Sequence, residues 1–327
     1  MKAETQRLST RPAPSAPSLA EIRLAARTIA PFIRRTALAP LNANPVSRSI
    51  FLKLENLQDL GVFKIRPVAN LLLNTPADKL QQGVYTASSG NGGLALAWMA
   101  RELSIVARVY APEGSPEIKL NTIRRLGAEV CLLAEPDWWQ IILDQGAPGD
   151  PGYYVDAVRN PLALAGNATL GLEIAEQLPG LETVIVPYGG GGVACGVAAA
   201  LRILQPKVRI VAAECEVATP LTAALAAGEP TPVEVRPSFI TGAGAPIVLN
   251  EMWPLASSLV KETCVVSLEQ VAGAIRHLAE FNHVVAEGAG AIAVAAALEL
   301  GQDAGRTACV VTGGNLDLPL LARLLQT

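Results

Sequence analysis

Lys64 is the residue whose type and setting could do covalent chemistry. It lies in the run Gly61-Val-Phe63-Lys64-Ile-Arg66 and begins an apolar stretch, Pro67 to Leu73, whose pattern predicts a helix. A lysine held against apolar surface is pushed towards its neutral amine form, and a neutral amine can form a Schiff base with an aldehyde. On spacing alone, a surface lysine with its stem lying along the protein would be the better interpretation. The neighbouring motifs favour the chemical one.

Three glycine-rich loops are each predicted to lie between a strand and a helix. They are Thr86-Ala-Ser88-Ser89-Gly90-Asn91-Gly92-Gly93, Val186-Pro-Tyr-Gly189-Gly190-Gly191-Gly192 and Val311-Thr312-Gly313-Gly314-Asn315. A helix N-terminus presents unpaired N–H groups and the positive end of the helix dipole, and glycine lets an anion approach that backbone closely. Two or three such loops predict a ligand with more than one anionic group, such as a phosphate and a carboxylate.

The tetraglycine loop also fits a second kind of ligand. Gly189-x-Gly191-x-x-Ala194 satisfies the loose dinucleotide fingerprint. Glu214 ends the next predicted strand about 20 residues later, where that motif places an acid for the ribose. A nicotinamide-dependent oxidoreductase is therefore an alternative, although it leaves the other two loops unexplained and gives Lys64 no role. A turn without a ligand is the plainer alternative.

Five motifs follow one another in an order that resembles a known enzyme family. They are Lys53-x-Glu55-x-x-Gln58, Gly61-x-Phe63-Lys64-x-Arg66, Ser88-Ser89-Gly90-Asn91, Gly189-Gly190-Gly191-Gly192 and Thr312-Gly313-Gly314-Asn315. Together they resemble the fold-type II enzymes that depend on pyridoxal 5′-phosphate (PLP), and they are most similar to the branch of serine/threonine dehydratases and serine racemases. The resemblance runs from about Ser18 to the C-terminus. It includes the runs Asp156 to Pro161, Ala165 to Glu173 and Glu287 to Ala291.

The resemblance implies a cofactor role for several of these residues. Lys64 would hold PLP as a Schiff base and later act as a base on one face of the cofactor. Gly189 to Gly192 would cradle the phosphate with backbone N–H groups. Phe63 would pack beside the ring, Asn91 would hydrogen-bond its phenolic oxygen, and Thr312 would face the pyridine nitrogen. A hydroxyl there leaves the nitrogen unprotonated, and the weaker electron sink that results suits β-elimination.

The resemblance also implies that Ser88, Ser89, Gly90 and Asn91 hold the carboxylate of the substrate. Ser89 matches the position that, in racemases and some dehydratases, is a second acid or base on the opposite face. The dehydratases usually carry histidine where this chain has Gly92. Losing that ring leaves room for a larger or differently charged substrate.

The implied activity is the removal of water, and then ammonia, from a hydroxy amino acid such as threonine or serine, giving a 2-oxo acid. A specialised version is the dehydratase of ectoine and hydroxyectoine breakdown, which belongs to this branch. The alternatives are β-replacement or racemisation, the second kept open by Ser89, and then the nicotinamide-dependent oxidoreductase. A non-catalytic amino-acid binder is disfavoured because Lys64, Asn91 and the tetraglycine loop are all present. No regulatory domain is recognisable after the catalytic part, which indicates a catabolic role.

Some relatives bind a divalent cation through a glutamate, a backbone carbonyl four residues on and an aspartate six residues on. Glu214 and Ala218 match the first two positions, but the third is Pro220, which has no carboxylate. We therefore expect a metal-free enzyme, or one with a monovalent cation or water there. A solvated strand end is the plainer interpretation of Glu214.

Short β-rich runs alternate with helical patterns, which predicts an α/β fold with a largely parallel sheet. Ser18-Leu-Ala-Glu21 is a capping box that opens a helix predicted to reach about Ile33. The expected strands are 50–54, 84–87, 105–110, 129–133, 183–187, 208–214 and 307–312.

The resemblance implies two interleaved three-layer α/β domains of the tryptophan synthase β-like kind. Residues 1–82 with 161–327 would form the large PLP-binding domain, and residues 83–160 the small domain that carries the substrate loop. A homodimer is the default of the family.

Composition agrees with an enzyme of this class. Half of the 327 residues are hydrophobic, 17% are charged and the net charge is −3, which gives no sign of a nucleic-acid partner. Five dispersed cysteines indicate reduced thiols in a cytoplasmic protein. The polar run Met1 to Pro17 lacks the apolar core of a signal peptide, and no run of roughly 18 apolar residues predicts a membrane span.

Overall fold

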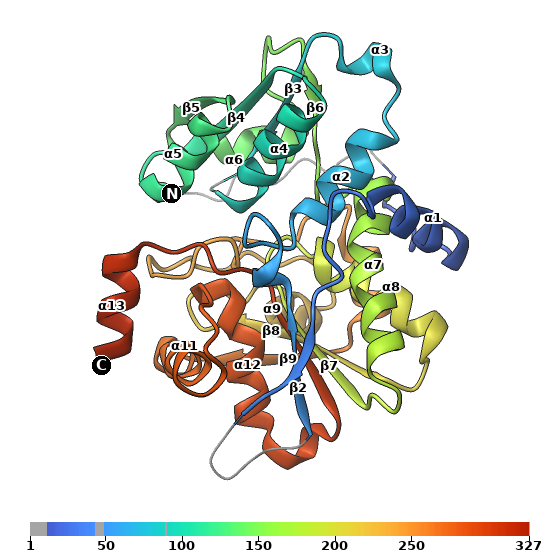
Figure 1. The fold of residues 1–327 in the computed structure, drawn as a ribbon, viewed down its shortest axis with the longest axis vertical. Helices are drawn as coiled ribbons and strands as arrows, with labels where there is room; N and C mark the ends of the chain where they lie inside the picture. The colour runs from blue at the N-terminus through green and yellow to red at the C-terminus, as the bar shows by residue number, and fades with distance from the viewer. Residues whose placement is uncertain (1–11, 43–48, 89, 327) are drawn as a thin grey trace.

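The chain forms two β-sheets, which lie one above the other in Figure 1. We call the four-stranded sheet with its helices the smaller layer and the six-stranded sheet with its helices the larger layer. The computed structural model describes residues 12–42, 49–88 and 90–326. The larger sheet contains, in order, β1 (Leu38–Pro40), β2 (Ile50–Leu54), β10 (Thr307–Val311), β7 (Thr183–Pro187), β8 (Arg209–Cys215) and β9 (Glu262–Val266). The smaller sheet contains, in order, β5 (Glu129–Leu133), β4 (Ala107–Pro112), β3 (Val84–Ala87) and β6 (Tyr153–Tyr154).

Helices cover both sheets. They are α1 (Leu19–Ile29), α2 (Ile65–Leu73), α3 (Ala77–Leu80), α4 (Asn91–Glu102), α5 (Glu117–Arg125), α6 (Glu135–Asp144), α7 (Pro161–Gln177), α8 (Gly192–Leu204), α9 (Pro220–Ala227), α10 (Trp253–Leu259), α11 (Leu268–Asn282), α12 (Gly288–Leu300) and α13 (Leu318–Gln326), with the 3-10 turns η1 (Glu55–Leu57) and η2 (Gly301–Ala304). Within the described ranges, none of these helices has the length and apolar character that crossing a membrane requires.

Strand direction confirms the expected α/β class. β1 and β2 are antiparallel, whereas the other paired strands of both sheets are parallel. The smaller sheet is built from the middle of the chain, and the larger sheet takes strands from before and after it, so the two layers interleave in sequence. The exact domain boundaries, 1–82 with 161–327 and 83–160, stay a prediction.

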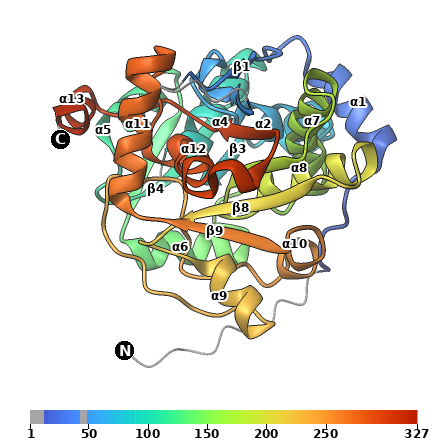
Figure 2. The same ribbon diagram turned by 90° about the horizontal axis from the view of Figure 1, so that it is seen from below.

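The larger sheet is buried on both faces, as parallel sheets usually are. Ile185 packs in a cluster with residues of α11 and α12, whereas its neighbours Val184 and Val186 pack with residues of α7 and α8. Successive side chains of a strand point to opposite faces, so one apolar strand fills two cores. Figure 2 shows β8 and β9 side by side at one edge of this sheet.

Several expected elements have shifted ends. The capping box at Ser18 is present, but α1 ends at Ile29 instead of Ile33. Pro31 has no N–H to donate to a further helical turn, so it stops the helix early. β4 begins at Ala107 instead of Ile105. Ile105 N donates a hydrogen bond to Ala100 O at the end of α4, so it is not available for pairing with a neighbouring strand.

A buried network of charges lies below the first turn of α2. Arg66 Nε donates to Glu55 Oε2 at 2.7 Å and Arg66 Nη1 to Glu173 Oε1 at 2.8 Å, while Lys53 Nζ donates to Glu173 Oε2 at 2.5 Å. Burial lowers the pKa of Lys53, and Glu173 opposes that shift. Burial works against ionisation of Glu55, but the Arg66 guanidinium holds the pKa of that carboxyl below its usual value. The network ties β2, α2 and α7 together.

Replacing Arg66 should therefore be costly. Arg66→Met keeps much of the volume but leaves the buried Glu55 carboxylate without its cation and Glu173 with Lys53 alone, so we expect the free energy of unfolding to fall by about 3–5 kcal/mol in urea denaturation. Arg35→Ala is the matched control, because it removes an ion pair with Glu176 whose two side chains are about half exposed, and such pairs contribute roughly 0–1 kcal/mol. Equal losses in the two variants would contradict this account.

Candidate active site

Lys64 lies at the junction of β10 and α2. It is the N-cap residue of α2, and the preceding segment is fixed to the end of β10: Phe63 N donates to Thr312 O at 3.0 Å, and Val62 forms a β-bridge with Gly313. The Lys64 amine lies 5.0 Å from the centre of the Phe63 ring. The two parts of the sequence that carry the lysine and the Thr312 loop therefore meet at one place.

The surroundings of Lys64 change its protonation. Burial lowers the pKa of the amine to about 8, and the negative charge of Asp156 acts in the opposite direction. At neutral pH a much larger share of this amine is uncharged than of an ordinary lysine. The amine is therefore poised for nucleophilic chemistry.

The tetraglycine loop follows β7 and opens α8. Gly191 has φ +90°, in the left-handed region that favours glycine, and Gly192 is the first residue of the helix. At each of the four glycines, neighbouring atoms lie too close for a larger side chain to fit without a shift. A Cβ at Gly189 would lie 2.9 Å from Gly242 O, and one at Gly190 would lie 3.2 Å from Val158 Cγ2. A helix N-terminus with an open backbone of this kind is a site for an anion.

Two buried polar side chains flank this loop, and sequence analysis missed both. Asn167 on α7 is 1% exposed, and neither atom of its amide has a hydrogen-bond partner among the described residues. A Cβ at Gly192 would lie 3.2 Å from its Nδ2. The Tyr188 hydroxyl is likewise buried without a partner in the described part of the chain, and a Cβ at Gly191 would lie 2.9 Å from it. Buried polar groups normally have partners, so the loop has unused hydrogen-bonding capacity on two sides.

A chain of contacts crosses from the smaller to the larger layer beside the loop at Gly90. Asn91 Nδ2 donates to Glu287 Oε1 at 2.5 Å, and Lys119 Nζ donates to Glu287 Oε2 at 2.8 Å. Lys119 also donates to Thr241 Oγ1 at 3.1 Å. Burial raises the pKa of Glu287, and Lys119 opposes that shift. The run at Glu287 is part of the family resemblance, but no pattern in the sequence singles out Lys119, which lies 168 residues away from it.

The loop after Thr312 differs from expectation, because it does not open a helix. α13 begins only at Leu318, so this loop is not a helix N-terminus for an anion. Its glycines serve close packing: a Cβ at Gly313 would collide with Glu287 Oε1, and one at Gly314 would lie 2.7 Å from Val285 O. The Thr312 hydroxyl donates to Ala289 O at 3.2 Å.

The expected substrate loop is described in part. Ser89 lies outside the described residues. Ser88 Oγ accepts a hydrogen bond from Gly90 N at 3.3 Å. A Cβ at Gly92 would lie 2.8 Å from that same hydroxyl oxygen. The room that we expected Gly92 to leave is therefore partly taken by Ser88.

Glu214 is not the solvated strand end of the plainer interpretation, because it is 1% exposed. Its carboxylate accepts hydrogen bonds from Leu221 N at 2.8 Å, Thr222 N at 2.9 Å and Thr222 Oγ1 at 2.6 Å, at the start of α9. Burial raises its pKa, and these hydrogen bonds oppose the shift. A carboxylate engaged in this way is not presented to a ribose, which removes the acid that the dinucleotide alternative needs.

An interleaved, largely parallel α/β fold that contains both a buried lysine of lowered pKa and a glycine-rich helix N-terminus has the features of a PLP-dependent enzyme. A comparison with family models agrees, since the model described as "Pyridoxal-phosphate dependent enzyme" matches residues 29–313. The chain belongs to this family.

Individual relatives show which members of the family this chain is similar to. The chain is 34% identical over 315 residues to an L-threonine ammonia-lyase of Thermotoga maritima, an alignment that covers 94% of this chain and 78% of the relative. Among solved structures it is similar to maize serine racemase, with a TM-score of 0.82, 28% identity and coverage of 95% and 98% of the two chains. It is also similar to a T.th. threonine deaminase, with a TM-score of 0.80, 30% identity and coverage of 92% and 99%.

The pKa of Lys64 leads to a test on the apoprotein. Covalent attachment of added PLP needs the neutral amine, so its rate should rise with pH through an inflection near the pKa of about 8. Asp156→Asn removes the charge that raises this pKa, so the inflection should move to lower pH, as measured by stopped-flow absorbance. The exposed Asp78 gives the control variant Asp78→Asn, which should leave it in place. An inflection near 10.5, the ordinary value for lysine, or an upward move in Asp156→Asn, would contradict the assignment.

Proposed function

We propose that this chain is a PLP-dependent ammonia-lyase that converts threonine or serine to the 2-oxo acid and ammonia. The observation that carries the proposal is the position of Lys64, whose amine has a lowered pKa and whose segment is bonded to the end of β10, the strand next to β7 and its tetraglycine loop. The chain also aligns over 94% of its length with an L-threonine ammonia-lyase. Threonine deaminase and serine racemase folds of similar extent support the same branch.

The residues at hand fit the cofactor. Gly189 to Gly192 would hold its phosphate at the N-terminus of α8, and the unpartnered polar atoms of Asn167 and Tyr188 beside this loop support an anion there. Lys64 would hold the cofactor covalently. Bound PLP would supply the electron sink for the carbon that loses its proton.

Three side chains are proposed to contact the ring. Phe63 would pack beside it, Asn91 would face the phenolic oxygen and Thr312 the pyridine nitrogen. Phe63 and Thr312 are joined through their backbones, and the Asn91 amide reaches the same place from the smaller layer through Glu287. A hydroxyl at the ring nitrogen favours elimination over reactions that need a stronger electron sink.

Proton transfer is proposed to involve Lys64 and the loop from Ser88 to Asn91. The neutral amine of Lys64, favoured by a pKa of about 8, would take the proton from the α-carbon of the substrate. Ser88, Ser89, Gly90 and Asn91 would hold the substrate carboxylate, with Ser89 as the acid or base on the opposite face. The contacts of Lys119 and Asn91 with Glu287 would hold the smaller domain against the larger one and exclude water.

Several finer points belong to the same proposal. Residues 83–160 would form the small domain and residues 1–82 with 161–327 the large one. The enzyme would act as a homodimer in the cytoplasm. It would need no divalent cation, because the hydrogen bonds to Glu214 already occupy its carboxylate. A role on the hydroxy amino acids of ectoine or hydroxyectoine breakdown is the specialised version, motivated by Gly92.

The test is a product assay with PLP supplied. L-Threonine or L-serine should give equal amounts of 2-oxo acid and ammonia, and Lys64→Ala should lower the rate by a factor of about 10²–10⁴ or more, because it removes the proposed base. Lys79→Ala is the control, since Lys79 is an exposed lysine on α3. EDTA should leave the rate unchanged.

Other outcomes would redirect the proposal. Formation of the D-amino acid without oxo acid would replace elimination by racemisation. Full activity of Lys64→Ala would overturn the assignment of the lysine. Loss of activity in EDTA, restored by Mg²⁺, would overturn metal independence alone. Oxo acid from a larger hydroxy amino acid but not from threonine or serine would favour the specialised version.

A further inference from the structure

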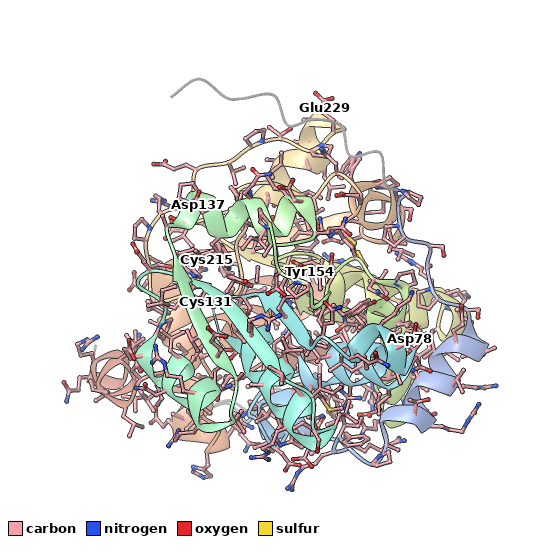
Figure 3. The ribbon with its side chains drawn as sticks, turned by 90° about the horizontal axis from the view of Figure 1, so that it is seen from above. Asp78, Cys131, Asp137, Tyr154, Cys215 and Glu229 are labelled. Atoms are coloured by element: carbon pink, nitrogen blue, oxygen red, sulfur yellow. The ribbon has the colours of Figure 1, made fainter. Side chains whose placement is uncertain are left out.

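A cavity of about 540 Å³ lies where the two layers and the N-terminal segment meet. Its wall includes the segment Pro12 to Ser15, Gln145 at the end of α6, Tyr153 and Tyr154 on β6, Arg159 and Glu251. Small-molecule sites in proteins have volumes of about 300–1,000 Å³, so this cavity is large enough for a small ligand. Figure 3 labels Tyr154 of β6, together with Asp137 in the first turn of α6.

The cavity is separate from the proposed cofactor site. Residues 155–160 connect β6 to α7 and run between the two. On one side, a Cβ at Gly190 would meet Val158 and one at Gly192 would meet Ala157 O, each at 3.2 Å. On the other side, Asp156 and Arg159 line the cavity. A ligand in the cavity would therefore approach the tetraglycine loop only from behind this segment.

The Asp156 carboxylate is already engaged by three hydrogen bonds within its own segment. Its Oδ1 accepts hydrogen bonds from Val158 N at 2.9 Å and Arg159 N at 3.0 Å, and its Oδ2 accepts one from Arg159 Nε at 2.6 Å. Arg159 Nη2 donates to Ile142 O at 2.5 Å. These contacts hold the guanidinium in place, but none of them involves its Nη1 group.

Arg159 Nη1 and Glu251 are the charged groups with unused capacity. Arg159 is 5% exposed, and its Nη1 has no hydrogen-bond partner among the described residues. Glu251 is 8% exposed, and its Oε1 lies 3.7 Å from Arg159 Nη1 and 3.4 Å from Gln145 Nε2, both long for hydrogen bonds. A buried charge with poor partners is costly. The cavity thus presents a positively charged hydrogen-bond donor, Arg159 Nη1, and a negatively charged acceptor, Glu251, and neither has a short hydrogen bond to the other.

We propose that this cavity binds a free α-amino acid as a zwitterion, with its carboxylate on Arg159 and its ammonium group on Glu251. A simple anion would be repelled by Glu251 and Asp156, and a simple amine would leave the Nη1 group of Arg159 without a hydrogen-bond partner, whereas a zwitterion satisfies both Nη1 and Glu251. Hydroxyl and amide groups of Tyr153, Ser15 and Gln145 remain for its side chain. The site is additional to the substrate position, and it is independent of which reaction the enzyme catalyses.

Occupation of the cavity would be felt at the proposed active site. Asp156, which holds Arg159, is also the charge that raises the pKa of Lys64. Gln145 is at the C-terminal end of α6 in the smaller layer, and Glu251 is just before α10 in the larger layer. A ligand held by Glu251 next to Gln145 would therefore bridge the two layers.

The test is calorimetric titration of the holoenzyme after borohydride reduction, which fixes the cofactor on Lys64 so that an added amine cannot attach there. Mass spectrometry of the reduced protein checks that link separately, so failure of the cofactor assignment is seen before any titration. L-Alanine, L-valine and L-glutamine are titrated one at a time. We expect saturable binding of at least one, and no binding of L-lactate or L-alanine methyl ester, which lack the ammonium and the free carboxylate.

A variant locates the site. Glu251→Gln keeps the shape of the side chain and should weaken binding by about tenfold or more, because it removes the charge that meets the ammonium group. Glu216→Gln, at an exposed glutamate, is the matched control and should bind as the wild type does. No saturable heat with any of the amino acids, equal binding of the two analogues, or an unchanged affinity in Glu251→Gln would overturn the proposal and leave a water-filled cavity.

Discussion

The buried pairing of Arg66 with Glu55 and Glu173 is the interaction on which the proposed active site depends. The Arg66 guanidinium and the Glu55 carboxylate are fully buried and Glu173 is nearly so, so leaving any of these charges without its partner would be costly. The pairing links the segment after β2 and the first turn of α2 to Glu173 on α7, which lies 107 residues further along the chain than Arg66. Lys64 is the residue that caps α2. Its position is thus fixed from below by charges and from above by the end of β10.

Parallel topology does the remaining positioning. β7 and β10 are neighbours and run in the same direction, so the tetraglycine loop after β7 and the Thr312 loop after β10 emerge at one edge of the sheet. Ligands of α/β proteins collect at this edge. The smaller layer then adds Asn91 and Lys119, whose shared partner Glu287 lies at the start of α12. A site assembled from two layers can respond to small movements between them.

Much of the fold was predictable because its signals are local. The capping box at Ser18, the strand before Gly189 and the helix after the tetraglycine loop each rest on a few neighbouring residues, and the structure has all three. The loop at Gly313 shows the limit of this approach. Its strand and glycines predicted a helix N-terminus, but the glycines serve contacts with Glu287 and Val285, and those partners are set by the folded chain.

The missed residues share one property: their roles come from partners far away in sequence. Lys119 is an ordinary lysine of an amphipathic helix until it meets Glu287. Asn167 stands within an apolar helix, and only its place beside Gly192 gives it significance. Glu214 was misjudged for the same reason, since the start of α9 folds back over it. No spacing rule reports such contacts.

The central claim is that Lys64 carries the cofactor. The most direct measurement is to load the protein with PLP, reduce it with borohydride, digest it and locate the modified lysine by mass spectrometry. The account predicts one phosphopyridoxyl group, on the peptide that contains Lys64. Modification of a different lysine, or no modification of a protein saturated with PLP, would contradict it.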